Sequence, residues 1–263
     1  MLIVLDETIG FSSLPFQVEN DISYVIKPAK TKKPNQTFEE YVKDQSSTVF
    51  SKNLRFSPYS MEDEIEFFSN VFQHDSTADL VIYFYDPSYT NHPVIRRVQN
   101  VFQPDRKLYP LPAALNRAET LFIMNQLVKK KEQFSTIGLT YQELRQHIKS
   151  WTAGASGWVF TPNIKSIFKK RTLHKVYRKK KQDMYTQVRI HDSGKLEARK
   201  KDTLYALWDD VKEDTDKSNT WVVTKATEMS LEEMPAYALK DEAFPVNVPY
   251  VQMFEPAKRH QST

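Results

Sequence analysis

The chain has 263 residues, of which 40% are hydrophobic, with 37 lysines and arginines against 33 aspartates and glutamates, a composition typical of a globular protein. It contains no cysteine, which excludes disulfide bridges, thiolate metal sites and a cysteine nucleophile. Its five glycines form no phosphate-binding loop, and the first residues lack the pattern of a signal peptide or a membrane helix. We therefore expect a cytoplasmic protein with no membrane partner.

Residues 1–112 predict an α/β domain whose strands are short and apolar. Met1–Leu5 and Ile22–Ile26 have the character of buried strands, and Leu80–Tyr85 is continuously apolar, as expected of a central strand. Asp6 follows the strand Met1–Leu5, and Asp86 follows the strand Leu80–Tyr85. The alternation of strands with helical segments predicts a layered sheet with these aspartates at strand ends.

The helices of this domain carry recognisable start signals. Thr37 precedes Glu40 by three residues, which is the pattern of a capping box at a helix N-terminus. The next helix is expected to begin at Ser60, with Asp63 three residues on. A further helix is predicted from His92 to Phe102. The prolines that follow, at 104, 110 and 112, indicate a domain boundary.

Residues 113–201 predict a mainly helical domain that ends in a hairpin. Helices are expected from Asn116 to about Phe134, from a second capping box at Thr140 and Glu143, and from Thr161-Pro162 onward. Two alternating segments around the turn His191–Gly194 then predict a β-hairpin. Three helices followed by a hairpin is the element order of a winged helix-turn-helix, although the segment 150–160 is longer than its usual turn. The fold expected is an α/β domain followed by a winged-helix-like domain.

The stretch from Lys165 to Lys201 is strongly basic. It holds fourteen lysines and arginines against three acidic residues, a net charge of +11, whereas the rest of the chain has 23 basic and 30 acidic residues. Such a density of like charge repels itself and is readily neutralised by phosphates. The charge pattern therefore favours a nucleic-acid-binding protein, with DNA or RNA as partner and no cofactor required. The residues predicted to contact phosphates are Lys169, Lys170, Arg171, Lys175, Arg178, Lys179, Lys180, Lys181, Arg189 and Lys195.

Residues 202–263 offer an alternative explanation of the basic stretch. An acidic run between Asp202 and Asp216 has the charge to fold back on the basic face and mask it, which would leave a non-enzymatic protein-interaction module. The proline-rich remainder predicts an extended C-terminal arm that docks on a partner subunit, on another protein or on the chain's own body.

Three carboxylates of the first domain form a second alternative site. Asp6 and Asp86 follow strands and Glu64 lies on the intervening helix, an order reminiscent of nucleases that bind metal ions at one edge of a sheet. Magnesium prefers such hard oxygen ligands. On this hypothesis Asp6, Glu64 and Asp86 are catalytic residues of a Mg²⁺-dependent nuclease or other strand-processing enzyme.

Overall fold

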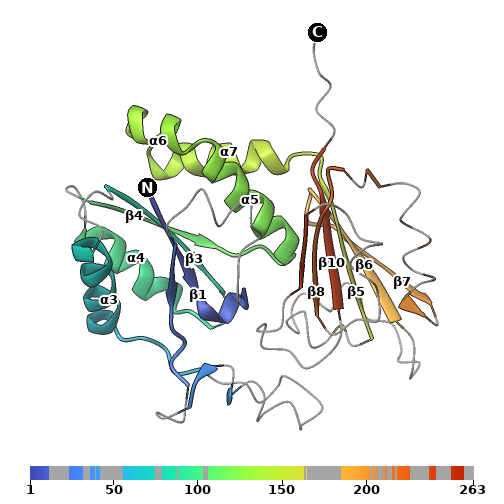
Figure 1. The fold of residues 1–263 in the computed structure, drawn as a ribbon, viewed down its shortest axis with the longest axis horizontal. Coiled ribbons are helices and arrows are strands. Elements are labelled where there is room, and N and C mark those ends of the chain that lie inside the picture. Colours follow the sequence, from blue (N-terminus) through green and yellow to red (C-terminus); the bar gives the residue numbers. More distant parts are fainter. Residues whose placement is uncertain are drawn as a thin grey trace. The chain divides into compact units, whose positions relative to one another are not determined.

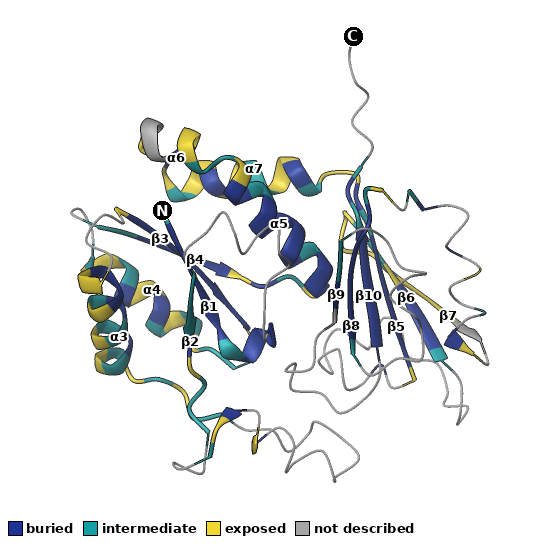
Figure 2. Ribbon diagram, viewed as in Figure 1, coloured by how far each residue is buried: buried dark blue, intermediate teal, exposed yellow. Residues whose placement is uncertain are grey.

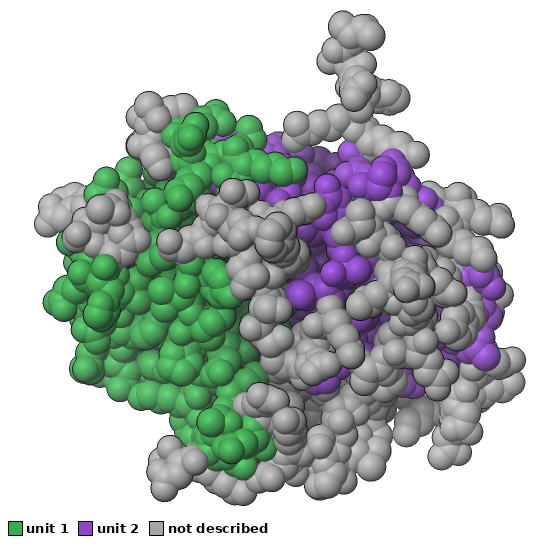
Figure 3. All heavy atoms as spheres, in the orientation of Figure 1, with its two compact units in different colours: residues 1–113, 128–141, 243–246 green, residues 114–127, 142–242, 247–263 purple. Residues whose placement is uncertain are grey.

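A computed structural model describes residues 1–11, 24–31, 36–38, 40–41, 56–74, 79–87, 89–102, 106–162, 164, 185–201, 203–204, 206, 209, 211, 215–216, 218–225, 237–240 and 250–257. The chain forms two compact units, which are coloured green and purple in Figure 3. Unit 1 consists of residues 1–113, 128–141 and 243–246, and unit 2 of residues 114–127, 142–242 and 247–263. Each unit is built around its own sheet.

The sheet of unit 1 is parallel and has the strand order β2-β1-β3-β4 (Figure 1). Its strands are β1 (Leu2–Asp6), β2 (Tyr24–Lys27), β3 (Leu80–Tyr85) and β4 (Lys107–Pro112). Leu5 pairs with Phe84 and Asp6 with Lys27, so the carboxyl ends of β1, β2 and β3 meet at one edge. The predicted strands at the N-terminus, near residue 24 and over Leu80–Tyr85 are therefore confirmed.

The central strands β1 and β3 are buried along their whole length, which explains their continuous apolar character (Figure 2). Helices α3 (Met61–His74) and α4 (His92–Val101) pack on one face of the sheet. The core on this face is made of side chains from both helices and from β1, β3 and β4: Leu2, Val4, Phe68, Val71, Phe72, Val81, Tyr83, Tyr85, Ile95, Val98 and Leu108.

Capping boxes are present at the predicted helix start Ser60 and at the predicted box of Thr37 and Glu40. The Ser60 amide donates to Asp63 at 2.9 Å, and the Asp63 amide donates to the Ser60 hydroxyl at 3.1 Å. The same reciprocal pair joins Thr37 and Glu40, at 2.9 and 3.2 Å. Each box satisfies two backbone N–H groups that have no partner inside a helix.

The proline cluster that predicted a break lies partly in a strand. Pro110 and Pro112 belong to β4, which pairs with β3 along one side only. A proline has no N–H to donate, and an edge strand tolerates that loss because, among the described residues, its outer side pairs with no other strand.

The helix expected from Asn116 to Phe134 is interrupted. It forms α5 (Arg117–Lys129) and α6 (Lys131–Ile137), separated at Lys130, whose φ of −108° and ψ of 10° are not helical. The Thr140 signal is followed by α7 (Tyr141–Thr152) as expected. No helix of the described residues has both the length and the apolar composition to cross a membrane.

Unit 2 contains a six-stranded sheet of order β7-β6-β5-β10-β8-β9. All its strand pairs are antiparallel except β8–β9. The strands are β5 (Ser156–Thr161), β6 (Tyr185–His191), β7 (Leu196–Lys201), β8 (Trp221–Lys225), β9 (Tyr237–Lys240) and β10 (Tyr250–Glu255). The expected C-terminal arm thus contributes β10, an inner strand that lies between β5 and β8.

Helix α5 packs on one face of this sheet. Phe122 packs on Trp221 and Phe254, with ring centroids 6.1 and 5.1 Å apart. At the start of the helix the Asn116 amide donates to the Met253 carbonyl, and the Asn116 side-chain oxygen accepts from the Ala118 amide at 3.0 Å.

The prediction of a mainly helical, winged-helix-like second domain is wrong. The segment expected to be a loop before the third helix is instead β5, an inner strand whose apolar residues Trp158, Val159 and Phe160 are buried. The hairpin predicted around residues 191–194 does exist as β6 and β7, but it forms one end of the six-stranded sheet and not a wing beside a helical bundle. Pairing of β5 with β10, whose residues lie nearly a hundred positions later, decides this architecture.

Candidate functional site

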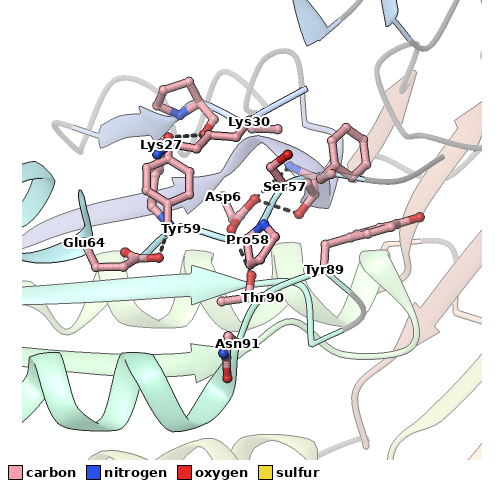
Figure 4. Close-up of a pocket in the computed structure, with 14 residues that line it drawn as sticks. Asp6, Lys27, Lys30, Ser57, Pro58, Tyr59, Glu64, Tyr89, Thr90 and Asn91 are labelled. Carbon is pink, nitrogen blue, oxygen red and sulfur yellow. Dashed lines mark hydrogen bonds and ion pairs between the residues drawn. The ribbon is translucent and has the colours of Figure 1, made fainter. Parts of the chain in front are cut away.

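A pocket opens at the carboxyl edge of the parallel sheet in unit 1 (Figure 4). Its empty volume, including the solvent-open mouth, is about 310 Å³. It lies where β1 ends and the loop after β3 begins. Because β2 lies on one side of β1 and β3 on the other, this is the point at which the strand order reverses, where open α/β sheets bind ligands. The lining residues are Asp6, Thr8, Lys27, Pro28, Ala29, Lys30, Phe56, Ser57, Pro58, Tyr59, Glu64, Tyr89, Thr90 and Asn91.

Asp6 is the centre of a cluster of hydroxyl groups. Its Oδ1 accepts from the Thr8 amide at 3.0 Å and from the Thr8 hydroxyl at 2.6 Å. Its Oδ2 accepts from the Tyr83 hydroxyl at 2.8 Å and from the Thr90 hydroxyl at 3.1 Å. The first contacts cap the short 3₁₀ helix Glu7–Ile9, and the others tie β1 to β3 and to the loop that follows β3.

A buried lysine joins this cluster to helix α3. The Lys27 ammonium donates to Glu64 Oε1 at 2.6 Å and to the Tyr83 hydroxyl at 3.1 Å, and it lies 3.9 Å from the centre of the Tyr59 ring. Lys27 and Glu64 are both about 2% exposed. A buried ion pair of this kind stays charged only when further hydrogen bonds compensate for the lost water, and Tyr83 supplies one of them.

The electrostatic environment of the pocket is rich in carboxylates. Burial, followed by the charges of Glu64, Asp6, Asp63 and Glu7, raises the pKa of Tyr59 to about 12. Burial, followed by the charges of Asp6 and Glu64, raises the pKa of Tyr83 well above its ordinary value. Burial is also the main cause that raises the pKa of Glu64, against the lowering effect of Lys27. Glu64 Oε2 has no hydrogen-bond partner among the described residues.

Two of the three predicted catalytic carboxylates meet in this pocket. Asp6 and Glu64 are connected through Tyr83 and Lys27, whereas Asp86 is buried outside the pocket lining, with its carbonyl accepting from the Tyr89 and Thr90 amides at 3.0 Å. Within the described part of the chain, no group of three or more histidine and carboxylate side chains is placed to hold a metal ion. Hydroxyl groups and a lysine occupy the acceptor positions of Asp6 and Glu64 Oε1 that a magnesium ion would need.

The predicted phosphate-contacting residues lie in unit 2. Eight of them, from Lys169 to Lys181, fall outside the described residues. Arg189 lies over the Trp158 ring at 5.7 Å and donates to the Ser156 hydroxyl at 3.3 Å. Lys195 forms an ion pair with Glu197 at 2.6 Å.

Sequence reasoning did not single out Lys27, Tyr83, Thr8 or Thr90. Lys27 directly follows the predicted strand Ile22–Ile26, and its place beside the end of β1 becomes a usable signal once parallel pairing is assumed. The sequence gives no indication that Tyr83 belongs to the site, because it lies within the apolar run of β3.

The fold and the pocket together define a class: a two-sheet α/β protein with a pocket at the carboxyl edge of its parallel sheet. No protein-family model and no curated protein sequence matches the chain. Solved structures do match its fold. Fatty acid kinase B3 protein of Streptococcus pneumoniae, loaded with linoleic acid, is 13% identical with a TM-score of 0.63, covering 98% of this chain and 99% of that one.

Two further structures have the same fold. A stearic-acid-binding protein from Eubacterium ventriosum is 13% identical with a TM-score of 0.60, and 97% of each chain is covered. A DegV lipid-binding protein from Thermotoga maritima is 14% identical with a TM-score of 0.58, covering 98% of this chain and 99% of that one. Likeness at this level of identity establishes the fold over nearly the whole chain.

These likenesses correct the predicted function and partner. The predictions of a nucleic-acid-binding protein and of a Mg²⁺-dependent nuclease are wrong, because the fold is that of proteins solved as fatty-acid and lipid binders. The same finding displaces the alternative of an interaction module with a masked basic face. The nucleic-acid prediction rested on the charge density of one segment. A high charge density indicates a surface that can attract anions, but it does not determine the fold.

Proposed function

We propose that the protein binds a single-chain lipid whose polar end enters the pocket of unit 1. The observation that carries this proposal is the likeness of nearly the entire chain to structures that hold linoleic or stearic acid, or that are described as lipid-binding. Fold likeness alone supports the class of ligand only by analogy. The pocket supplies the second, independent support.

The pocket has the composition expected of a site for an amphiphile's polar end. Hydroxyl, ammonium and carboxylate groups lie beside the apolar surfaces of Phe56, Pro58 and Tyr89, and Phe56 and Tyr89 pack edge to face at 4.9 Å. The empty space of about 310 Å³ includes the open mouth of the pocket, so only part of it is enclosed by protein. The proposal therefore places only the polar end of the lipid at this pocket.

The test is recovery of lipid from the purified protein. The full chain is expressed in a bacterial host, purified without detergent, and weighed by mass spectrometry under native and denaturing conditions. We expect a mass difference equal to one lipid molecule per chain, with the lipid released by organic extraction.

A pocket variant and a matched control sharpen this test. Tyr89→Ala removes part of the apolar wall and should reduce the lipid-bearing fraction several-fold, whereas Val101→Ala, at a 49% exposed position outside the pocket lining, should not. Absence of lipid, together with failure of the delipidated wild-type chain to bind either oleate or monooleoyl glycerol, would overturn the proposal.

A further inference from the structure

The two lysines that line the pocket differ in how firmly their partners hold them. Lys27 is about 2% exposed and donates to the buried carboxylate of Glu64 at 2.6 Å. The Lys30 side chain is 38% exposed, and it pairs at 2.6 Å with Asp63, whose side chain is 36% exposed. Water can solvate both partners of the second pair when they separate, but not those of the first. Lys30 is therefore the lysine of the lining that can change partner at little cost.

Asp63 keeps hydrogen bonds of its own when Lys30 leaves it. Its Oδ2 accepts from the Ser60 amide at 2.9 Å, and its own amide donates to the Ser60 hydroxyl at 3.1 Å, so the two residues cap α3. The hydrogen bond from Lys30, followed by those with Ser60, lowers the pKa of Asp63 to about 2. A carboxylate in the first turn of a helix is also stabilised by the positive end of the helix dipole. Release of Lys30 therefore leaves Asp63 charged, hydrogen-bonded and open to water.

The backbone of Lys30 is tied to the pocket, whereas its ammonium group is partly exposed. The Lys30 carbonyl accepts from the Ser57 amide at 2.7 Å, and the ammonium lies 4.6 Å from the centre of the Tyr59 ring. Ser57, Tyr59 and Lys30 itself all line the pocket. Figure 4 shows Lys30 on the side of the pocket opposite Asn91. Rotation about the side-chain bonds of Lys30 is then sufficient to move its ammonium from Asp63 to a ligand.

The other charges of the lining are already compensated. The lining contains the carboxylates of Asp6 and Glu64 and the ammonium groups of Lys27 and Lys30. Hydroxyl and amide groups donate four hydrogen bonds to Asp6, and Glu64 pairs with Lys27. Asp63, the partner of Lys30, is outside the residues that line the pocket. An anionic ligand can therefore neutralise Lys30 without breaking the buried network.

A carboxylate is the headgroup that matches these donors. Its two oxygens only accept hydrogen bonds, and its charge can replace that of Asp63 beside Lys30. Ser57 and Asn91 add a hydroxyl and an amide to the lining, and the Asn91 side chain makes no hydrogen bond that caps α4. An uncharged headgroup brings no charge to exchange for that of Asp63, so it would leave the ion pair in place.

We propose that Lys30 is the cation that binds the ionised carboxylate of the lipid, and that Asp63 competes with this headgroup for Lys30. The inference rests on the proposed lipid-binding function and names the residue that selects the headgroup. Asp63 then sets the affinity, because every carboxylate that binds has to displace it from Lys30.

The experiment compares two ligands that have the same acyl chain and different headgroups. Delipidated full-length protein is titrated calorimetrically with oleate and with monooleoyl glycerol, both delivered from cyclodextrin, at about pH 8, where a carboxyl group is ionised. The wild-type protein should bind oleate more tightly. Lys30→Met should weaken oleate binding by about ten-fold, the loss expected for one hydrogen bond to a charged group, and leave monooleoyl glycerol binding unchanged.

The variant Asp63→Asn tests the competition directly. Asparagine keeps a side-chain oxygen that can accept from the Ser60 amide, so the helix cap is retained while the charge that holds Lys30 is lost. Oleate should bind this variant several-fold more tightly than the wild-type protein, and monooleoyl glycerol should bind both equally. Lys30→Arg keeps a cation at this position and should retain most of the oleate affinity.

Lys195→Met is the matched control. Lys195 also forms an exposed pair with a carboxylate at 2.6 Å, but it lies on the hairpin of unit 2 and outside the pocket lining. Its removal changes the net charge by the same amount as Lys30→Met. The affinities for both ligands should therefore equal those of the wild-type protein.

The outcomes separate this inference from the function on which it rests. Unchanged oleate affinity in Lys30→Met would overturn the assignment of Lys30, and so would equal weakening of both ligands, since a merely structural role predicts that result. Oleate affinity that does not rise in Asp63→Asn would overturn the competition, and this variant decides alone if Lys30→Met does not fold. A wild-type preference for monooleoyl glycerol would overturn the headgroup while lipid binding stands. Failure of the wild-type protein to bind either ligand would overturn the proposed function itself.

Discussion

Two lysine–glutamate pairs have the same N–O distance of 2.6 Å and opposite surroundings. Lys27 and Glu64 in unit 1 have side chains that are 2% and 3% exposed, whereas Lys195 and Glu197 in unit 2 are 68% and 45% exposed. The first pair belongs to a network with Tyr83, Asp6 and the Tyr59 ring. The second bridges the end of a hairpin turn, with His191 as a further neighbour of Glu197 at 3.3 Å.

The comparison teaches that burial, and not the density of charge along the chain, distinguishes the ion pair that lines the pocket of unit 1. The basic residues of β7 lie on an edge strand, where positive side chains hinder pairing with the edge of another molecule. Such residues have a structural role even without an anionic partner. Lys27 and Glu64 of unit 1, in contrast, are removed from water at the carboxyl edge of a parallel sheet, which is a costly placement at the point where open α/β sheets bind ligands.

The largest expected effect is that of Lys27→Met. It leaves Glu64 buried without its cation, which should lower the free energy of unfolding by about 3–5 kcal/mol, as measured by urea denaturation near pH 8. The double variant Lys27→Met, Glu64→Leu should recover much of this loss, because no uncompensated charge then remains. A small loss of stability in Lys27→Met would show that the buried pair Lys27–Glu64 does not differ energetically from the exposed pair Lys195–Glu197.

An intermediate effect is expected from Glu119 on α5 of unit 2. Burial raises the pKa of this partly exposed carboxyl from 4.5 to about 7. The folded state therefore retains the proton longer than the unfolded state, so the stabilising contribution is complete below pH 4.5 and is lost as the pH rises through 7. The loss is at most about 3 kcal/mol, from the energy equivalent of one pKa unit.

Glu119→Gln should remove this part of the pH dependence. Urea midpoints measured between pH 4.5 and 8 should vary less in the variant than in the wild-type protein, whereas Glu66→Gln at an exposed site should follow the wild-type curve. Superimposable profiles of the wild-type protein and Glu119→Gln would contradict the assignment.

The smallest effect is expected from Lys195→Met, in the exposed counterpart of the buried pair. Lys195 and His191 lower the pKa of Glu197 through hydrogen bonds, but water solvates both partners when the pair is broken. The urea midpoint should be unchanged within error, and the variant should bind lipid as the wild-type protein does. A loss of stability comparable to that of Lys27→Met would remove the distinction between the two pairs.

Much of unit 1 could be predicted because its signals are local. The strand Leu80–Tyr85 follows from six consecutive apolar or aromatic residues, and the helix starts at Thr37 and Ser60 follow from side chains three residues apart. The hairpin of β6 and β7 follows from alternation around a four-residue turn. In each case the interacting groups are close in sequence, so their pattern is visible without the fold.

The candidate site could be predicted only in part. The sequence pattern indicates Asp6 and Glu64 as carboxylates near a sheet edge, but it does not indicate the residues that they contact. Lys27 and Glu64 are 37 residues apart in the sequence, and Tyr83 and Asp6 are 77 residues apart. The same limitation hid the true architecture of unit 2. The run Trp158–Phe160 is an inner strand only because residues 251–253 pair with it from the far end of the chain.

The amino-acid sequence by itself determined the local elements, the absence of cysteine chemistry, the two capping boxes and the segregation of charge along the chain. Tertiary structure alone decided which charges are buried and which strands are edges. The physical reason is that burial and hydrogen-bond saturation depend on contacts between distant segments, which periodicity along one segment does not contain.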